Sequence, residues 1–188
     1  TRSRQVTGVQ TCALPIFMAY NIAEHPDVML PIMICQDGFI TSHAVMNMQL
    51  LDDLTVKEFV GERQPVDYLL NPDETFAVGP YAVSDYYMES RKAQAHAMEN
   101  AKKVILDVAK KFEKISGRKY GLIEEYKMHD AEYAVVIIGS AAGTTKDAID
   151  RMRANGDKVG LIKVRSFRPF PGEEIAASLK KCKAVAVM

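Results

Sequence analysis

The hydrophobic positions between Ser84 and Ser116 follow a helical period. Apolar residues recur there at intervals of three and four, and so form one stripe along a helix: Ala95, Met98, Ala101, Ile105, Val108, Phe112 and Ile115. Gly117 suits the helix end, because glycine adopts the left-handed conformation at little cost. Such a helix would span about 50 Å, so we expect it to bridge two bodies rather than lie within one.

The last third of the chain alternates between strand and helix patterns. Apolar runs predict strands at 132–139, 158–165 and 184–188, and the segments between them predict helices at 145–155 and 173–181. Strands joined through helices run parallel with right-handed crossovers. We therefore expect an α/β fold with a parallel β-α-β-α-β domain from residue 131, and a truncated one, because the chain stops inside the third strand.

The pattern before residue 61 is less regular. Residues 17–24 resemble the last turns of a helix that Pro26 ends. The apolar run 28–35 (VMLPIMIC) predicts a strand buried on both faces, although its internal proline removes one ladder donor. Residues 45–51 are a weaker strand candidate, and the two aspartates at 52 and 53 could cap a short helix ending at residue 60.

Two segments have no such periodicity. Residues 61–83 contain several prolines and a glycine, which is typical of a surface connector. Residues 1–16 (TRSRQVTGVQTCALPI) lack the continuous apolar region of a signal peptide and resemble a translated sequencing adaptor. We therefore expect residues 1–16 to be non-native.

Composition narrows the function classes. The chain has 188 residues, 48% of them hydrophobic and 26% charged, as in soluble globular proteins. The 24 basic and 24 acidic residues balance, which removes the electrostatic reason to expect nucleic acid or an anionic membrane as a partner. No apolar run is long enough to span a membrane, so we expect a cytoplasmic protein.

The cysteines do not form a metal-binding pattern. Cys12, Cys35 and Cys182 are odd in number and far apart, without the C-x-x-C spacing of zinc or iron–sulfur sites. We expect no metal site, and we expect Cys35 and Cys182 to be buried free thiols in a reducing compartment.

A glycine-containing segment lies where dinucleotide folds hold a pyrophosphate, between a strand and a helix start. It runs from Gly139 to Gly143, and Thr144 could cap the following helix. Its spacing is G-x-x-x-G rather than G-x-G-x-x-G, which favours a structural turn. The alternative is an anion or nucleotide site that includes Arg165 and Arg168. These arginines could equally bind an acidic surface of a neighbouring domain or subunit.

A second candidate site follows the apolar run 28–35. Asp37, Gly38, Phe39 and His43 lie in the loop after it, and ligands of open α/β sheets favour the carboxyl ends of strands. His43 could exchange a proton near neutral pH. A histidine in this position is also often structural, so both interpretations stay open. We interpret the neighbouring serine as structural, because it lacks a nucleophile-elbow context.

Six sequence blocks resemble the alpha subunit of pyruvate:ferredoxin oxidoreductase, and they occur in that family's order and spacing. They are QDGFITSH (36–43), NPDETFAVGP (71–80), AMENAKKVI (97–105), GRKYGLIEEY (117–126), IGSAAGTTKDAID (138–150) and KVGLIKVRSFRPFP (158–171). The resemblance covers residues 17–188. It implies the C-terminal part of a thiamine-diphosphate pyrimidine-binding domain at 17–60, a connector and long helix at 61–130, and a truncated domain II similar to the transketolase C-terminal domain at 131–188.

The resemblance also implies an activity, used in anaerobic metabolism. Pyruvate is oxidatively decarboxylated to acetyl-CoA while ferredoxin is reduced, using thiamine diphosphate with Mg²⁺, coenzyme A and 4Fe–4S clusters in a complex with beta, gamma and delta subunits. The family's substrate-binding threonine and arginine and its cofactor-activating glutamate have no counterpart here. We therefore expect the fragment alone to hold none of these cofactors and to be inactive. Only Asp37, Gly38, Phe39 and His43 match a family loop near the active site, and no catalytic residue is assigned.

Two alternatives stay open. The chain could belong to an oxidoreductase for another 2-oxoacid, since the residues that select the substrate are absent. It could instead be a nucleotide- or coenzyme-A-binding regulatory α/β module that uses residues 139–143. A purely structural interaction module is partly contained in the first interpretation.

Overall fold

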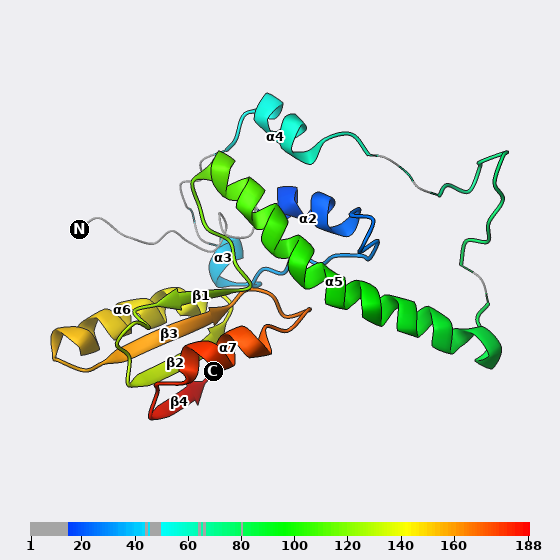
Figure 1. The fold of residues 1–188 in the computed structure, drawn as a ribbon. Helices are drawn as coiled ribbons and strands as arrows, with labels where there is room; N and C mark the ends of the chain where they lie inside the picture. The colour runs from blue at the N-terminus through cyan, green and yellow to red at the C-terminus, as the bar shows by residue number, and fades with distance from the viewer. Residues whose placement is uncertain (1–14, 44, 46–49, 64, 66, 80) are drawn as a thin grey trace.

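The computed structural model describes residues 15–43, 45, 50–63, 65, 67–79 and 81–188, and it has a helical half and a sheet half (Figure 1). The helical half contains α2 (Pro15–Ala23), α3 (Ile40–His43), α4 (Asp53–Val60) and α5 (Ser84–Ser116). The sheet half contains β1 (Ile123–Tyr126), β2 (Tyr133–Ile138), α6 (Ala141–Ala154), β3 (Val159–Val164), α7 (Gly172–Leu179) and β4 (Ala184–Val187). The predicted α/β class is confirmed.

The sheet has four strands in the order β1-β3-β2-β4. β2 pairs in parallel with both β3 and β4, as the β-α-β-α-β pattern predicts. β1 pairs antiparallel with β3, Ile123 opposite Val164, and the pattern analysis assigned it to no element. Its sequence, IEEY, carries two central glutamates, which suits an edge strand but gives no buried-strand signal.

Helices cover both faces of this sheet, and alternate strand residues separate into two cores. Val135, Ile137 and Leu161 share a core with Ala142 and Ile149 of α6. The residues between them face the other way, where Val136, Ile162 and Val164 pack with Ile175 and Leu179 of α7. The central strands are therefore buried on both faces, which explains their nearly continuous apolar sequence.

The helical half is built around the C-terminal half of α5. Val104, Val108 and Phe112 of that helix share a core with Met18 and Ile22 of α2. Phe112 is completely buried at 0% exposure, and its ring centroid lies 5.1 Å from that of Phe59 in α4 and 5.8 Å from that of Tyr120. The third hydrophobic core therefore joins three helices and the chain segment that leads into the sheet.

The long helix has the predicted bounds. Gly117 ends it with φ +66°, and its N–H donates to Glu113 O at 2.8 Å. Burial begins only at Ala101, and the N-terminal half of α5 projects beyond the other helices (Figure 1). The predicted stripe is therefore a packing face in its C-terminal part, while Ala95 is exposed and Ile115 is 36% exposed.

The predicted buried strand at 28–35 is wrong. No strand is assigned there, and only Val28 of the run is buried, whereas Met33 is 84% exposed. Cys35 is also exposed and Cys182 is half-buried, so the prediction of two buried thiols is wrong. A strand buried on both faces needs neighbouring strands, and none of the described residues forms a strand pair with this run.

The other predictions for the N-terminal part have mixed outcomes. α2 ends before Pro26 as predicted, but it begins at Pro15, inside the segment assigned as non-native; residues 1–14 lie outside the described part. Most of the weak strand candidate at 45–51 also lies outside it. The short helix α4 is confirmed, and Asp52 caps it by accepting a hydrogen bond from Thr55 N at 2.9 Å.

The helix after β2 begins earlier than predicted. α6 starts at Ala141, and Ser140 occupies the N-cap position, so the cap assigned to Thr144 is wrong. Gly139 makes the turn with φ +85°, and Gly143 lies within the helix, where its N–H donates to Ser140 O at 3.0 Å. The two alanines at 141 and 142 are good helix formers, which moves the start toward the strand.

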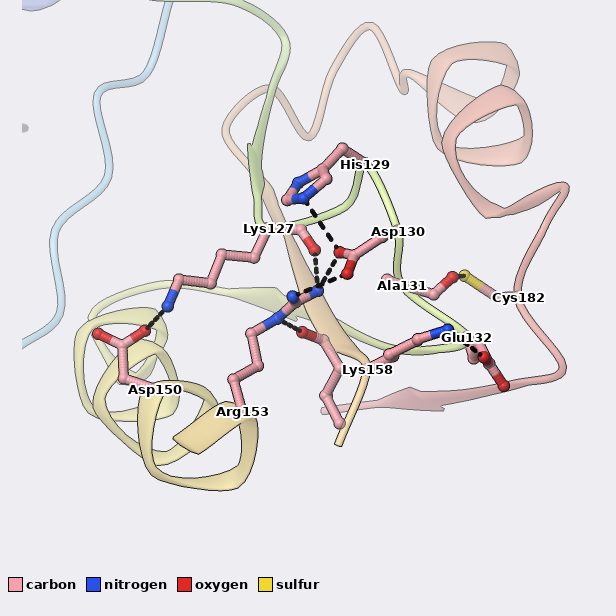
Figure 2. Close-up of polar contacts among 10 residues, drawn as sticks. Lys127, His129, Asp130, Ala131, Glu132, Asp150, Arg153, Lys158 and Cys182 are labelled. Carbon is pink, nitrogen blue, oxygen red and sulfur yellow. Dashed lines mark hydrogen bonds and ion pairs between the residues drawn. The ribbon is translucent and has the colours of Figure 1, made fainter. Parts of the chain in front are cut away.

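An arginine near the end of α6 fixes the turn between β1 and β2 (Figure 2). Arg153 donates through Nη2 to Asp130 Oδ1 and to Lys127 O, both at 2.7 Å, and through Nε to Val159 O at 2.6 Å. The guanidinium fork suits this set of acceptors. It holds the turn, the helix and the start of β3 together, which sets the register of the antiparallel edge strand.

Two glycine-to-alanine substitutions test this packing, because they are expected to change the free energy of unfolding in opposite directions. A Cβ at Gly160 of β3 would lie 2.5 Å from Met128 Sδ and 2.9 Å from Lys127 O, whereas a Cβ at Gly143 of α6 meets no atom within 4 Å. We expect Gly160→Ala to lower the free energy of unfolding by about 1–3 kcal/mol through overpacking. Gly143→Ala should raise it by about 0.5–1 kcal/mol. Urea denaturation measures both, and a destabilising Gly143→Ala would contradict the helical assignment of residue 143.

Candidate functional site

The loop from Asp37 to His43 is a tightly capped turn. The Asp37 carboxylate accepts hydrogen bonds from Thr41 N at 3.0 Å and from Thr41 Oγ1 at 2.7 Å. Thr41 is buried, at 3% exposure. A carboxylate that accepts from the backbone and side chain four residues on fixes the first turn of α3. The four-residue spacing of Asp37 and Thr41 is the sequence signal that could have predicted this cap.

The other end of the loop carries His43. Its Nδ1 atom lies 2.8 Å from Ser42 Oγ and 3.2 Å from Phe39 O. Its ring packs against the Phe39 ring with centroids 5.2 Å apart. His43 is exposed and Phe39 is 73% exposed, so a rigid turn presents an aromatic pair at the surface. The structure therefore brings the candidates Asp37, Gly38, Phe39 and His43 together in one built loop.

The second candidate group lies at the carboxyl ends of β2 and β3. Ile138 pairs with Val164, so Gly139 and Arg165 follow neighbouring strand ends. Arg165 is engaged by the protein itself: it donates to Glu124 Oε2 at 2.6 Å and to Lys119 O at 2.9 Å. Its guanidinium also lies 5.3 Å from the centroid of the Tyr120 ring. Arg165 thus fastens the entry to β1 through both Nη atoms, while its buried Nε has no hydrogen-bond partner among the described residues.

The remaining basic candidate, Arg168, is exposed in the loop between β3 and α7. Phe167 and Phe170 flank it and are also exposed, with ring centroids 6.4 Å apart in a T-shaped arrangement. Ser166 Oγ donates to Pro169 O at 2.9 Å and closes the loop. The structure holds this loop and the Asp37–His43 loop by separate sets of contacts.

Glu124 on β1 lies among several positively charged side chains at the edge of the sheet. Burial by itself would raise the pKa of its carboxyl group. The hydrogen bond from Lys146 and the positive charges of Arg165, Lys146 and Lys163 outweigh burial and hold the pKa below its ordinary value. This group could not be found from sequence patterns, because the partners of Glu124 come from α6, β3 and the residue after β3.

The described residues contain no cluster of side chains suited to hold a metal ion. No group of three or more His, Cys, Asp or Glu side chains in the described ranges is placed to hold a metal ion. The donor set that a Mg²⁺-bound diphosphate requires is therefore not assembled there, and no chemical step is assigned to such a group. Across the described part of the chain, no helix combines the length and the apolar content needed to cross a membrane.

Both halves of the molecule match the models of known families. Residues 5–110 match the model of the pyruvate flavodoxin/ferredoxin oxidoreductase, thiamine diphosphate-binding family, and residues 131–188 match that of pyruvate:ferredoxin oxidoreductase core domain II. The first match covers more than half of the chain and the second covers the sheet from Ala131 onward. The chain therefore belongs to the pyruvate:ferredoxin oxidoreductase family, which confirms the predicted resemblance.

Individual relatives agree with this assignment. The chain is 44% identical over 171 residues to pyruvate synthase subunit PorA of Thermotoga maritima, covering 91% of this chain and 44% of that one. It is 44% identical over 175 residues to PorA of Methanocaldococcus jannaschii, covering 92% and 45%. The alpha subunit of NADH-dependent phenylglyoxylate dehydrogenase of Aromatoleum evansii is 40% identical over 179 residues, covering 91% and 43%. The chain thus spans less than half the length of these relatives.

One solved structure is also similar. It is a 2-oxoglutarate:ferredoxin oxidoreductase from Magnetococcus marinus with 2-oxoglutarate, coenzyme A and succinyl-CoA bound, at 19% identity and a TM-score of 0.41 over 57% of this chain and 16% of that one. A similarity of this size is too low to define the fold.

Glu124→Gln tests the charge network at the sheet edge. Because the pKa of Glu124 is lower in the folded state, the unfolded state binds more protons as the pH falls. The stability that Glu124 contributes is therefore present above its ordinary pKa of 4.5 and is lost as the pH falls through the folded value. We expect Glu124→Gln to lower the free energy of unfolding by about 1–3 kcal/mol at neutral pH, with a smaller difference in acid.

Urea denaturation at about pH 7 and about pH 3 measures this difference. The matched control is Glu89→Gln on the exposed half of α5, which should leave stability nearly unchanged at both pH values. An equal loss for Glu124→Gln at both pH values would contradict the assigned role of its charge.

Proposed function

We propose that this chain forms part of the alpha-type subunit of a pyruvate:ferredoxin oxidoreductase. The proposed reaction is the thiamine-diphosphate-dependent oxidative decarboxylation of pyruvate to acetyl-CoA with reduction of ferredoxin. The observation that carries the proposal is the order of two matches on one chain, a thiamine diphosphate-binding family region at 5–110 followed by core domain II at 131–188. Similarity to PorA subunits over about nine-tenths of the chain, 91% and 92% in two cases, supports it.

The domain assignment is part of the proposal. Residues 17–60 would form the C-terminal part of the pyrimidine-binding domain, 61–130 the connector and long helix, and 131–188 a domain similar to the transketolase C-terminal domain. A sheet with parallel central strands and α6 and α7 on opposite faces supports the last assignment. The run 28–35, exposed beyond its first residues, supports the first, because such a segment needs a partner surface to cover it.

Two surface elements receive roles in the assembled enzyme. The Asp37–His43 loop would lie near the active site, since it presents His43 and Phe39 on a rigid turn. The loop with Arg168 between Phe167 and Phe170 would contact an acidic surface of a neighbouring domain or subunit. Mg²⁺, coenzyme A, 4Fe–4S clusters and the beta, gamma and delta subunits belong to the proposed complex, and ferredoxin is its electron acceptor.

One relative supports an alternative substrate. The relative from Aromatoleum evansii is named for phenylglyoxylate, also a 2-oxoacid, and its 40% identity is close to the 44% of the PorA subunits. Another 2-oxoacid is therefore the alternative to pyruvate. The nucleotide-binding module receives no such support, because Gly143 lies within α6.

A chimera tests the proposal with the protein as it exists. We expect this sequence, replacing the matching region of Thermotoga maritima PorA in the complete complex, to retain pyruvate-dependent ferredoxin reduction, because the two align over 171 residues. The controls are the unmodified complex and a complex whose PorA lacks the region. Loss of all 2-oxoacid-dependent reduction in a correctly assembled chimera would overturn the proposal.

A further inference from the structure

We propose that the loop holds neutral His43 as its Nδ1–H tautomer and presents Nε2 as a hydrogen-bond acceptor for a ligand with an O–H or N–H group. The tautomer follows from the contacts of this chain alone. The ligand role rests on the proposed function, which places the loop near the active site. The proposal therefore has two parts, and each has its own measurement.

The carbonyl of Phe39 gives the first reason for a proton on Nδ1. This oxygen lies 3.2 Å from His43 Nδ1, and a carbonyl oxygen can only accept a hydrogen bond. An unprotonated Nδ1 at this distance would place two lone pairs against each other. The contact is favourable only when Nδ1 carries the hydrogen.

The hydroxyl of Ser42 gives the second reason. It has a single hydrogen, and Ser42 Oγ lies 2.6 Å from Gly38 O, a short contact between two oxygens that requires this hydrogen between them. Ser42 Oγ then offers only lone pairs to His43 Nδ1, 2.8 Å away. Both neighbours of Nδ1 are thus acceptors, and they assign the hydrogen to the same nitrogen.

The ring is held in this orientation while its other nitrogen stays accessible. The Phe39 ring packs against the imidazole at 5.2 Å, and the Asp37–Thr41 cap anchors the turn through a buried side chain. His43 itself is exposed, and none of the described residues hydrogen-bonds its Nε2. In the neutral ring this nitrogen carries the lone pair, so it can accept a hydrogen bond or a proton from a ligand.

Another histidine of the same chain has the opposite arrangement. His25 Nδ1 accepts a hydrogen bond from the backbone N–H of Asp27 at 3.2 Å, and the Asp27 carboxylate lies farther away, with Oδ2 3.8 Å from the same nitrogen. That contact requires a lone pair on Nδ1 and so favours the Nε2–H tautomer. His25 and His43 therefore form a matched pair within one molecule, in which the backbone presents a donor to one Nδ1 and an acceptor to the other.

The tautomer is measured by long-range ¹H–¹⁵N NMR of the full chain at about pH 8.5. We expect a protonated Nδ1 and an unprotonated Nε2 for His43, and the reverse for His25. Ser42→Ala removes one of the two acceptors and should shift His43 toward the Nε2–H form, while His25 stays unchanged. Finding His43 mainly as the Nε2–H tautomer overturns the first part, whatever the enzyme's activity.

The ligand role is tested by two substitutions in the PorA chimera. In His43→Asn the amide nitrogen can replace Nδ1–H and keep the loop contacts, but the acceptor at the Nε2 position is lost. In His43→Gln the amide reaches the Nε2 position and can supply an acceptor there, but the Nδ1–H contact is lost. We expect His43→Asn to keep its melting temperature and lose at least tenfold in kcat/KM for pyruvate, and His43→Gln to recover part of that activity at a lower melting temperature.

The opposite order of activity in the two variants would indicate a structural role for His43 rather than a ligand role. Full activity in His43→Asn, with loss of both stability and activity in His43→Gln, would overturn the acceptor role and leave His43 as a loop residue. An inactive chimera with His43 intact contradicts the proposed function and the ligand role with it. The NMR result on the free chain would stand independently of that outcome.

Discussion

The burial of Phe112 is the packing interaction on which the arrangement of the two halves depends. Its ring is 0% exposed and contacts Phe59 of α4 and Tyr120, which follows α5. Tyr120 in turn lies 5.3 Å from the guanidinium of Arg165, the residue after β3. One aromatic side chain therefore joins the helical core to the sheet. A buried phenylalanine generally contributes about 3–5 kcal/mol, a large part of the stability of an ordinary domain.

A second connection between the halves is weaker. Lys102 of α5 pairs with Glu173 and Glu174 of α7 at 3.1 and 2.9 Å, but Glu173 is 92% exposed. Exposed ion pairs contribute about 0–1 kcal/mol, so this contact sets orientation more than stability. Together the two connections fix the C-terminal half of α5 against the sheet. The helix thus links the two matched family regions as a packed element rather than as a loose linker.

Sequence patterns predicted the elements that have an uninterrupted hydrophobic period or apolar run of their own. The bounds of α5 follow from an uninterrupted stripe and Gly117, and the parallel direction of the strands follows from apolar runs separated by helices. The errors arise where partners are distant. The run 28–35 is apolar yet mostly exposed, since hydrophobicity records what a segment can bury and not whether a neighbour is present. β1 was missed because Arg153 and Glu124 hold it through contacts with α6 and residue 165.

The candidate site shows the same limit at the level of single atoms. Asp37, Phe39 and His43 could be grouped from sequence because they are close along the chain, but sequence does not say which imidazole nitrogen faces Phe39 O. Arg165 is the converse case. Its charge suggested an anion site, but in the structure its guanidinium contacts Glu124, Lys119 O and the Tyr120 ring. A polar group is available to a ligand only where the fold has left it without an internal partner. Both Nη atoms of Arg165 are engaged in this way, whereas His43 lies exposed, which is the basis of the acceptor role proposed above for its Nε2.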